Sequence, residues 1–202
     1  GLVVFGCRQG GSPTFASFRS WLGRAPETPP DADRLLVRKF LHCHGPSTPA
    51  LLAEWLGCSP AQARRLWNSV AQELEPVSVE GKARWLLSAD RDALAHPCGP
   101  QERLLLLGPH DPYLDTRDRD VLLPDKALQK LVWRTVGNPG AVVLDGRISG
   151  VWTARTVRDR LELSVTAWQA FSARQQSMLE IRAQEYAAFR GLSLLKYTLE
   201  DG

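Results

Sequence analysis

Several common signals of protein class are missing from this sequence of 202 residues. There is no apolar run of membrane-spanning length and no signal-peptide pattern at the start, so we expect no membrane partner. The four cysteines are widely spaced and form no Cys-x-x-Cys pair, which favours free thiols of a reducing compartment over a disulfide framework. Together these absences predict a cytoplasmic protein.

The sequence also lacks the common catalytic and metal-binding motifs. It has no Gly-x-Ser-x-Gly, no phosphate-binding P-loop and no Gly-x-Gly-x-x-Gly, and its four histidines do not have the spacing of metal ligands. His42, Cys43 and His44 are adjacent, but neighbouring helical residues point to different faces and cannot easily share one ion. We therefore expect neither a metal nor a cofactor, and the residues alone suggest no catalytic group.

Charge of one sign is not in excess. The formal net charge is +3, the sequence pI is about 8.8, and hydrophobic and charged residues make up 44% and 23% of the chain. This mildly basic, globular composition is compatible with a nucleic-acid partner without requiring one. The only methionine is Met178, so we expect the chain to be part of a longer protein.

Residues 31–90 carry the clearest pattern. A helix is expected from Asp33 to Gly45, and Thr48 and Ser59, each followed by proline, are expected to cap two further helices. Two helices joined by a tight turn, followed by strands on either side of residues 80–82, predict a helix-turn-helix with a β-hairpin, that is, a winged-helix domain.

The flanking segments are predicted to be different. Residues 1–30 are expected to form a hairpin, its second strand spanning residues 15–22, and a Pro-rich linker. An isolated hairpin is marginal in water, so we interpret it as the wing of a truncated upstream winged helix. Residues 91–202 predict a C-terminal α+β domain with a buried strand near Leu104, a helix capped by Asp125 and a strand hairpin with its tip at residues 145–147. A long helix from Ser172 to Gly191 and a last strand over residues 192–200 complete it.

The third helix of the winged-helix domain, expected over residues 60–74, is the predicted recognition helix. Such helices enter the DNA major groove, where Gln and Asn bind adenine edges and Arg binds guanine or phosphate. Its candidate DNA contacts are Gln62, Arg64, Arg65 and Asn68, with Gln72 near its end, and those of the wing are Lys82 and Arg84. A winged helix used for protein contact, with a merely solvated polar face, is the alternative.

The stretch from His110 to Asp125 contains five aspartates, with Arg117 and Arg119 between them. The spacing does not fit a calcium loop, while Asp118 and Asp120 would suit magnesium with a phosphate substrate. Because arginines alternate with the acids, we favour internal ion pairing and helix capping over a metal. In a mixed arrangement, the aspartates orient Arg117 and Arg119, which bind phosphate.

The run from Gly108 to Arg155 resembles the most characteristic segment of the AlkZ-like winged-helix proteins. It follows their pattern of a WDPYLLGRDR-like stretch, a PD-initiated helix ending in tryptophan, and GNPGxVLVDGxVxGxW, with His110 in place of a common tryptophan. HGPSTPALLAEWLG and EGKARWLL are also similar to the family, so the resemblance covers nearly the whole chain.

The resemblance implies tandem winged helices in a C-shaped cradle, with a C-terminal β-rich, barrel-like part. It further implies a bacterial DNA glycosylase that removes alkylated purines and unhooks interstrand crosslinks in double-stranded DNA without a metal. The family assigns catalysis to a Gln-x-Gln or Gln-x-Asp pair, and neither occurs in this sequence. The resemblance therefore implies a fold and a DNA-binding role but no catalytic residue. On this basis we add Arg117, Arg119 and Arg147 to the candidate DNA contacts. A non-enzymatic winged-helix regulator and a protein-interaction module remain alternatives, and the oligomeric state stays open.

Overall fold

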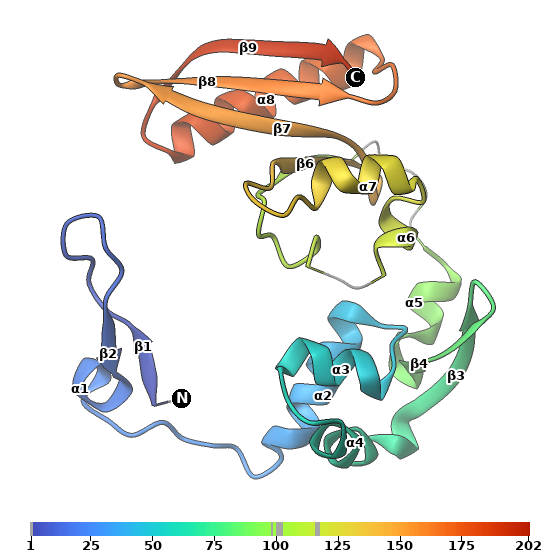
Figure 1. The fold of residues 1–202 in the computed structure, drawn as a ribbon. Helices are drawn as coiled ribbons and strands as arrows, with labels where there is room; N and C mark the ends of the chain where they lie inside the picture. Colours follow the sequence, from blue (N-terminus) through green and yellow to red (C-terminus); the bar gives the residue numbers. More distant parts are fainter. Residues whose placement is uncertain (1, 98, 100–102, 116–117) are drawn as a thin grey trace. The chain divides into compact units, whose positions relative to one another are not determined.

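The computed structural model describes residues 2–97, 99, 103–115 and 118–202. The chain divides into two compact units, Gly1–Pro97 and Cys98–Gly202. Figure 1 shows their elements, and each unit is described by itself.

The first unit begins with a short antiparallel hairpin of β1 (Val3–Phe5) and β2 (Phe15–Ser17), followed by helix α1 (Phe18–Leu22). The prediction of one strand over residues 15–22 was therefore wrong in its second half. Phe18, Trp21 and Leu22 lie at positions i, i+3 and i+4. This is the spacing of one face of a helix, and here it prevails over the alternating pattern of a strand. Gly23 ends the helix in the left-handed conformation, with φ of 70°, and donates its N–H to the Arg19 carbonyl.

Three helices form the body of the first unit: α2 (Ala32–His44), α3 (Pro49–Leu56) and α4 (Pro60–Asn68). The predicted caps are confirmed. The Thr48 hydroxyl accepts from the Leu51 N–H at 3.3 Å, and the Ser59 hydroxyl accepts from the Gln62 N–H at 3.2 Å. The turn between α3 and α4 is tight because Gly57 adopts a φ of 63° that ends α3.

Helix α4 is shorter than predicted, since it ends at Asn68 rather than near Leu74. The Ser69 hydroxyl donates to the Leu66 carbonyl at 2.6 Å, a local bond that competes with continuation of the helix. A 3₁₀ turn, η1 (Ala71–Glu73), follows, so Gln72 lies outside α4.

An antiparallel hairpin of β3 (Leu74–Val79) and β4 (Lys82–Leu87) follows the helices, with a two-residue turn at Glu80 and Gly81. A 3₁₀ turn, η2 (Ser88–Asp90), and helix α5 (Arg91–Ala95) end the unit. The helices and hairpin share one core, whose buried members include Val37, Phe40, Leu41, Leu52, Leu66, Trp67, Val70 and Leu87.

The second unit is built on a five-stranded sheet in the order β5-β6-β7-β8-β9. Its strands are β5 (Leu104–Leu107), β6 (Gly140–Leu144), β7 (Arg147–Val157), β8 (Arg160–Ala167) and β9 (Ser193–Asp201). The first four pair antiparallel. Strand β9 pairs parallel to β8, because the 17-residue helix α8 (Ala173–Phe189) carries the chain back between them.

The barrel-like expectation for this unit was wrong. Within the described part of the chain, β5 and β9 are the two edges of an open sheet and do not pair. Helix α8 contacts β5, β8 and β9 and buries Leu179, Ala183 and Ala187, so one helix covers the face that a barrel would enclose. Closure of the sheet is then not needed to bury its apolar side chains.

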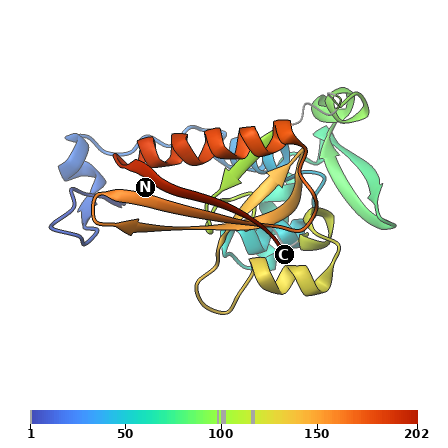
Figure 2. The ribbon, with the colours of Figure 1, turned by 90° about the horizontal axis from the view of Figure 1, so that it is seen from above.

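The two faces of the sheet are covered differently, because neighbouring strand residues point to opposite sides. Val142 and Trp152 lie in the core under α8, whereas Ala141 and Val143 lie in a core with Leu122. The second core is closed by the short helices α6 (Arg119–Leu122) and α7 (Lys126–Val132). Figure 2 shows α8 on one side of the sheet and α7 on the other.

Gly140 provides a test of the close packing at this sheet. A Cβ there would lie 2.2 Å from Nε1 of Trp152, whose N–H donates to the Leu107 carbonyl at 2.8 Å. We expect Gly140→Ala to lower the free energy of unfolding by about 1–3 kcal/mol, because the indole must move. Urea unfolding followed by tryptophan fluorescence measures this. Gly108→Ala, where a Cβ would meet nothing within 4 Å, is the control. Equal stability of the two variants would contradict the packing argument.

Candidate nucleic-acid interface

Helix α4 has one buried and one exposed face. Ala63, Leu66 and Trp67 are buried in the core of the first unit. The residues predicted to contact DNA, Gln62, Arg64, Arg65 and Asn68, are all exposed. The helix contains no acidic residue, so its solvent face combines two positive charges with two side-chain amides.

The two arginines of this face have different surroundings. Arg65 pairs with Asp33 of α2 at 2.7 Å, and both side chains are more than half exposed. An ion pair this exposed contributes little, so a phosphate can replace the carboxylate at low cost. Arg64 forms no ion pair within the described residues, and its charge is uncompensated.

The β3–β4 hairpin presents only one of its two predicted cations. Lys82 and Arg84 lie on the same face of β4, because strand residues alternate. Lys82 is exposed beside the turn, whereas Arg84 is only 8% exposed and takes part in a contact of its own. A phosphate could reach Arg84 only if this side chain moved, so the structure gives Lys82 the better position.

In the second unit, Arg147 lies at the tip of the β6–β7 hairpin, as predicted. Asp145 and Gly146 have φ of 47° and 83°, and the Asp145 carboxylate accepts from the Arg103 N–H at 2.9 Å. Tyr113 donates its hydroxyl to the Gly146 carbonyl at 2.7 Å, and burial raises the pKa of this phenol, which keeps it a donor. The tip is therefore held in place, with the Arg147 side chain exposed.

A second basic hairpin tip was missed by the sequence reasoning. The turn between β7 and β8 is formed by Arg158, with φ of 58°, and Asp159, and Arg160 follows; all three are exposed. Arg155 nearby is bonded to Glu162 at 2.6 Å. The signal was present as three arginines within TARTVRDR, a stretch predicted only to form strands.

The aspartates of residues 110–125 have local roles. Asp111 accepts from the Tyr113 N–H at 2.9 Å, and Asp120 accepts from Lys126 and, at 2.7 Å, from Gln129. Asp125 accepts from the N–H groups of residues 127 and 128, which confirms the predicted cap of α7. No group of three or more histidine, cysteine or acidic side chains with the geometry of a metal site occurs among the described residues.

Within the described part of this segment, Arg119 has no ion pair with an acid, contrary to the ion pairing expected of the interleaved arginines. Its guanidinium carbon lies 4.7 Å from the centroid of the Trp133 ring. Trp133 donates its indole N–H to the Leu114 carbonyl at 2.9 Å. The prediction for Arg117 falls outside the described residues.

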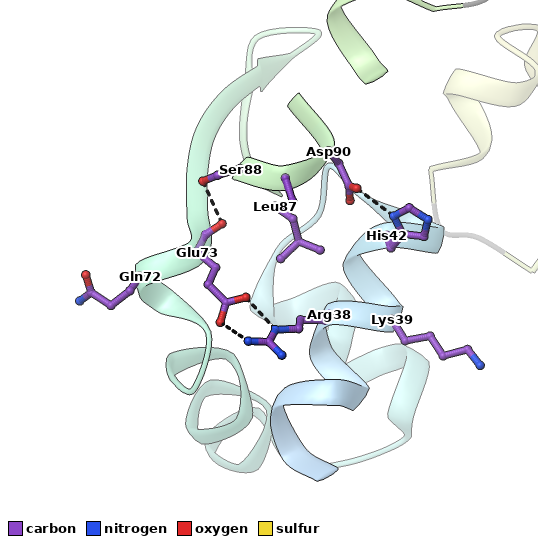
Figure 3. A pocket seen from close by; sticks show the side chains of 9 residues that line it. Arg38, Lys39, His42, Gln72, Glu73, Leu87, Ser88 and Asp90 are labelled. Atoms are coloured by element: carbon purple, nitrogen blue, oxygen red, sulfur yellow. Dashed lines mark hydrogen bonds and ion pairs between the residues drawn. The ribbon is translucent and has the colours of Figure 1, made fainter. Parts of the chain in front are cut away.

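The first unit also has an open pocket of about 700 Å³ between α2, η1 and η2 (Figure 3). Arg38 forms a two-point contact with Glu73, at 2.7 and 2.9 Å, and Arg34 reaches the same carboxylate at 2.9 Å. His42 contacts Asp90 at 2.9 Å. Arg38 and His42 of the pocket wall thus have carboxylate partners, whereas Lys39, which also lines the pocket, and Arg64 on α4 have none among the described residues.

The rings of His42 and His44, which lie on either side of Cys43 in the sequence, point to different partners. His42 points to Asp90 (Figure 3), whereas the His44 ring lies 5.5 Å from the Phe40 ring and 5.7 Å from the Trp55 ring.

None of the described helices combines the length and the apolar composition needed to cross a membrane.

Comparison with known proteins gives a consistent result. A family model described as "DNA glycosylase AlkZ-like" matches residues 1–189. The "Interstrand DNA cross-link repair glycosylase" of Streptomyces sahachiroi is 30% identical over 206 residues, covering 96% of this chain and 53% of that protein. The solved structure of Streptomyces sahachiroi DNA glycosylase AlkZ matches with a TM-score of 0.73 and 26% identity, over 98% of this chain and 54% of that one. The chain thus spans about half the length of these relatives.

Glu73 makes the stability of the first unit depend on pH. Its hydrogen bonds to Arg38 and Arg34 lower the pKa of the carboxyl to about 2, from an ordinary 4.5. A lowered folded-state pKa means that the ionised group stabilises fully above about pH 4.5, and that this contribution is lost as the pH falls towards 2. We expect Glu73→Gln to be less stable than the parent at pH 7, with the difference shrinking from about pH 4.5 downwards.

Chemical unfolding of both proteins between pH 2 and pH 7 measures this difference. Glu27→Gln is the matched control, since Glu27 is 87% exposed and its contact with Arg24 is 3.4 Å long. We expect this control to match the parent throughout. A Glu73→Gln deficit that stays constant over the whole range would refute the ion-pair explanation.

Proposed function

The chain belongs to the AlkZ-like DNA glycosylase family, and we propose that it forms the duplex-binding part of a winged-helix glycosylase acting on alkylated or crosslinked DNA. The observation that carries the proposal is the exposed face of α4, where Arg64 and Arg65 lie beside Gln62 and Asn68 without any acidic side chain on the helix. Arginines bind phosphate and guanine, and side-chain amides bind adenine edges, so this face suits the DNA major groove.

In this proposal, α2, α3 and α4 with the β3–β4 hairpin form a winged helix. Helix α4 is the recognition helix, α3 precedes it across the Gly57 turn, and the hairpin is the wing. Lys82 at the wing tip binds a backbone phosphate. The order of the elements and their shared core support this arrangement.

The second unit is proposed to add further contacts. The backbone of the β6–β7 tip is held by the bonds of Tyr113 to Gly146 and of Asp145 to Arg103, so the place of Arg147 on the hairpin is fixed before binding. Arg158 and Arg160 at the β7–β8 tip and Arg119 above Trp133 are further candidates, and Arg117 is retained from the sequence prediction. Two-stranded β-ribbons fit the major groove, which is the physical reason to include the hairpin tips.

No catalytic residue is proposed within residues 1–202. The Gln-x-Gln or Gln-x-Asp pair that the family resemblance associates with base removal does not occur in this sequence. The chain is therefore assigned the binding and placement of DNA, and base removal is assigned to the rest of the proposed enzyme. The same absence favours the second candidate, a winged-helix protein that binds DNA without modifying it.

Binding to a duplex over a series of salt concentrations tests the role of α4. We expect Arg64→Ala/Arg65→Ala to weaken binding by on the order of tenfold or more, and to reduce the slope of log K against log salt by about 2, because each lost phosphate contact releases about one counterion fewer.

A second double variant, Arg24→Ala/Arg91→Ala, removes the same charge from the first unit outside α4. Both arginines have carboxylate partners, Glu27 and Glu75. We expect it to change the slope much less. Equal losses in the two double variants would show that only net charge matters and would rule out α4 as the recognition helix.

A base-release assay tests the division of labour. We expect the 202-residue chain to bind a duplex containing N7-alkylguanine without releasing the base, and a full-length protein that contains this chain to release it. The measurement is the appearance of free alkylguanine and of strand breaks at abasic sites after alkali. Release by the chain alone would place catalytic groups within it. Failure of the full-length protein, with binding intact, would support the non-enzymatic candidate.

A further inference from the structure

Helices α6 and α7 are joined by two neighbouring contacts along one stripe of α7. Asp120 is held by Lys126 and Gln129, and the Arg119 guanidinium lies over the ring of Trp133, which follows Gln129 by four residues and caps the end of α7. Residues at this spacing share a helix face, so both contacts come from the same side. We propose that Trp133 is a positioning residue that holds Arg119 for a backbone phosphate of duplex DNA. This inference rests on the proposed function.

The charge of Arg119 is available for such a phosphate. In the part of the chain that the structure describes, its recorded side-chain contact is the indole ring and not a carboxylate. Three of the neighbouring acids are occupied: Asp120 is paired with Lys126, Asp125 caps α7, and Asp118 has a contact of its own. An aromatic face attracts a cation through its quadrupole but leaves the N–H groups at the guanidinium edge free to donate.

Trp133 is well suited to fix the position of this guanidinium. Its ring is partly buried against the core of α6 and α7, and its N–H is bonded to the Leu114 carbonyl. The ring therefore cannot turn freely, and a planar guanidinium stacked on it loses little further freedom when it binds. An unsupported surface arginine would have to be ordered at that moment.

The local balance of charge also favours an anionic partner. Residues 118–134 hold four basic and three acidic side chains. Lys130 lies one turn before Arg134 and three residues before Trp133, and it is not ion-paired in the described structure. With Asp120 neutralised by Lys126, the side chains around the ring present an excess of positive charge to a phosphate.

A double-mutant cycle on the 202-residue chain tests the proposal. The variants are Arg119→Gln, Trp133→Leu and both together, and the measurement is the affinity for a lesion-free duplex across a salt series. We expect Arg119→Gln to weaken binding about fivefold and to reduce the salt slope by about 0.9, the value for one phosphate contact. Trp133→Leu should weaken binding about two- to fivefold, the usual contribution of an exposed cation–π contact.

The decisive comparison is the effect of Trp133→Leu in the parent chain and in the Arg119→Gln variant. Since Trp133 acts through Arg119, Trp133→Leu should have no further effect on affinity once Arg119 is glutamine. An equal loss in both backgrounds would overturn the proposal, because the ring would then act on DNA directly or only on the fold. Trp133→Phe keeps an aromatic face but loses the bond to Leu114 that fixes the ring, so its loss of affinity should be smaller than that of Trp133→Leu. This loss too should disappear once Arg119 is glutamine, so Trp133→Phe serves in the cycle if Trp133→Leu does not fold.

Arg190 provides the matched control. It is exposed and lies over the Tyr186 ring at 5.8 Å, so Arg190→Gln removes one stacked guanidinium from the same unit. We expect this variant to keep the parent's affinity and slope. If Arg190→Gln lost as much affinity as Arg119→Gln, the loss would be explained by net charge alone. The proposed phosphate contact of Arg119 would then be overturned. If the parent chain itself fails to bind duplex DNA, the proposed function fails; if it binds and the cycle shows no coupling, only this inference fails.

Discussion

The burial of Ala63, Leu66 and Trp67 decides what the first unit presents to solvent. Once these side chains enter the core with α2 and β4, the helical period turns residues 62, 64, 65 and 68 outward together. The polar face of α4 is therefore a direct consequence of how the apolar face packs. Caps at Thr48 and Ser59 start α3 and α4 at defined residues, and Gly57 lets the chain turn between them, so the orientation of the face depends on the same few positions.

The treatment of charge differs between two parts of the molecule. Around Glu73, two arginines converge on one carboxylate, and the result is an internal ion pair that helps hold α2 to the segment after α4. On α4 and on α6, by contrast, Arg64 and Arg119 are exposed and have no carboxylate partner in the described structure. Arginines of the first kind stabilise a fold, and those of the second kind remain able to bind an external anion. The proposed contacts Arg64 and Arg119 belong to the second kind, whereas Arg65 has a carboxylate partner, Asp33, that a phosphate would have to replace.

The second unit uses one sheet to support two different surfaces. Because α8 covers one face and α6 and α7 cover the other, both cores are closed without a barrel. The hairpin tips at residues 145–147 and 158–160 extend from a sheet that is anchored on both sides. The Asp-rich segment belongs to the same support, since Asp111 orders the turn that carries Tyr113, and Tyr113 in turn holds the β6–β7 tip. The segment that first suggested a metal thus organises a loop, a helix start and a hairpin.

Features governed by neighbouring residues were predictable from the sequence. The caps at Thr48, Ser59 and Asp125, the turn at Asp145 and Gly146, and the exposed face of α4 each depend on side chains within a few positions of one another, and all are found where expected. What only the tertiary structure decided involves partners distant in the chain. The end of α4, the open sheet, the burial of Arg84 and the stacking of Arg119 on Trp133 were not predicted, because each depends on which surfaces meet when the chain folds. Local hydrogen bonding and helical period can be worked out from neighbouring residues, but the choice between an ion pair and an aromatic ring for one arginine is made by the packing of whole elements.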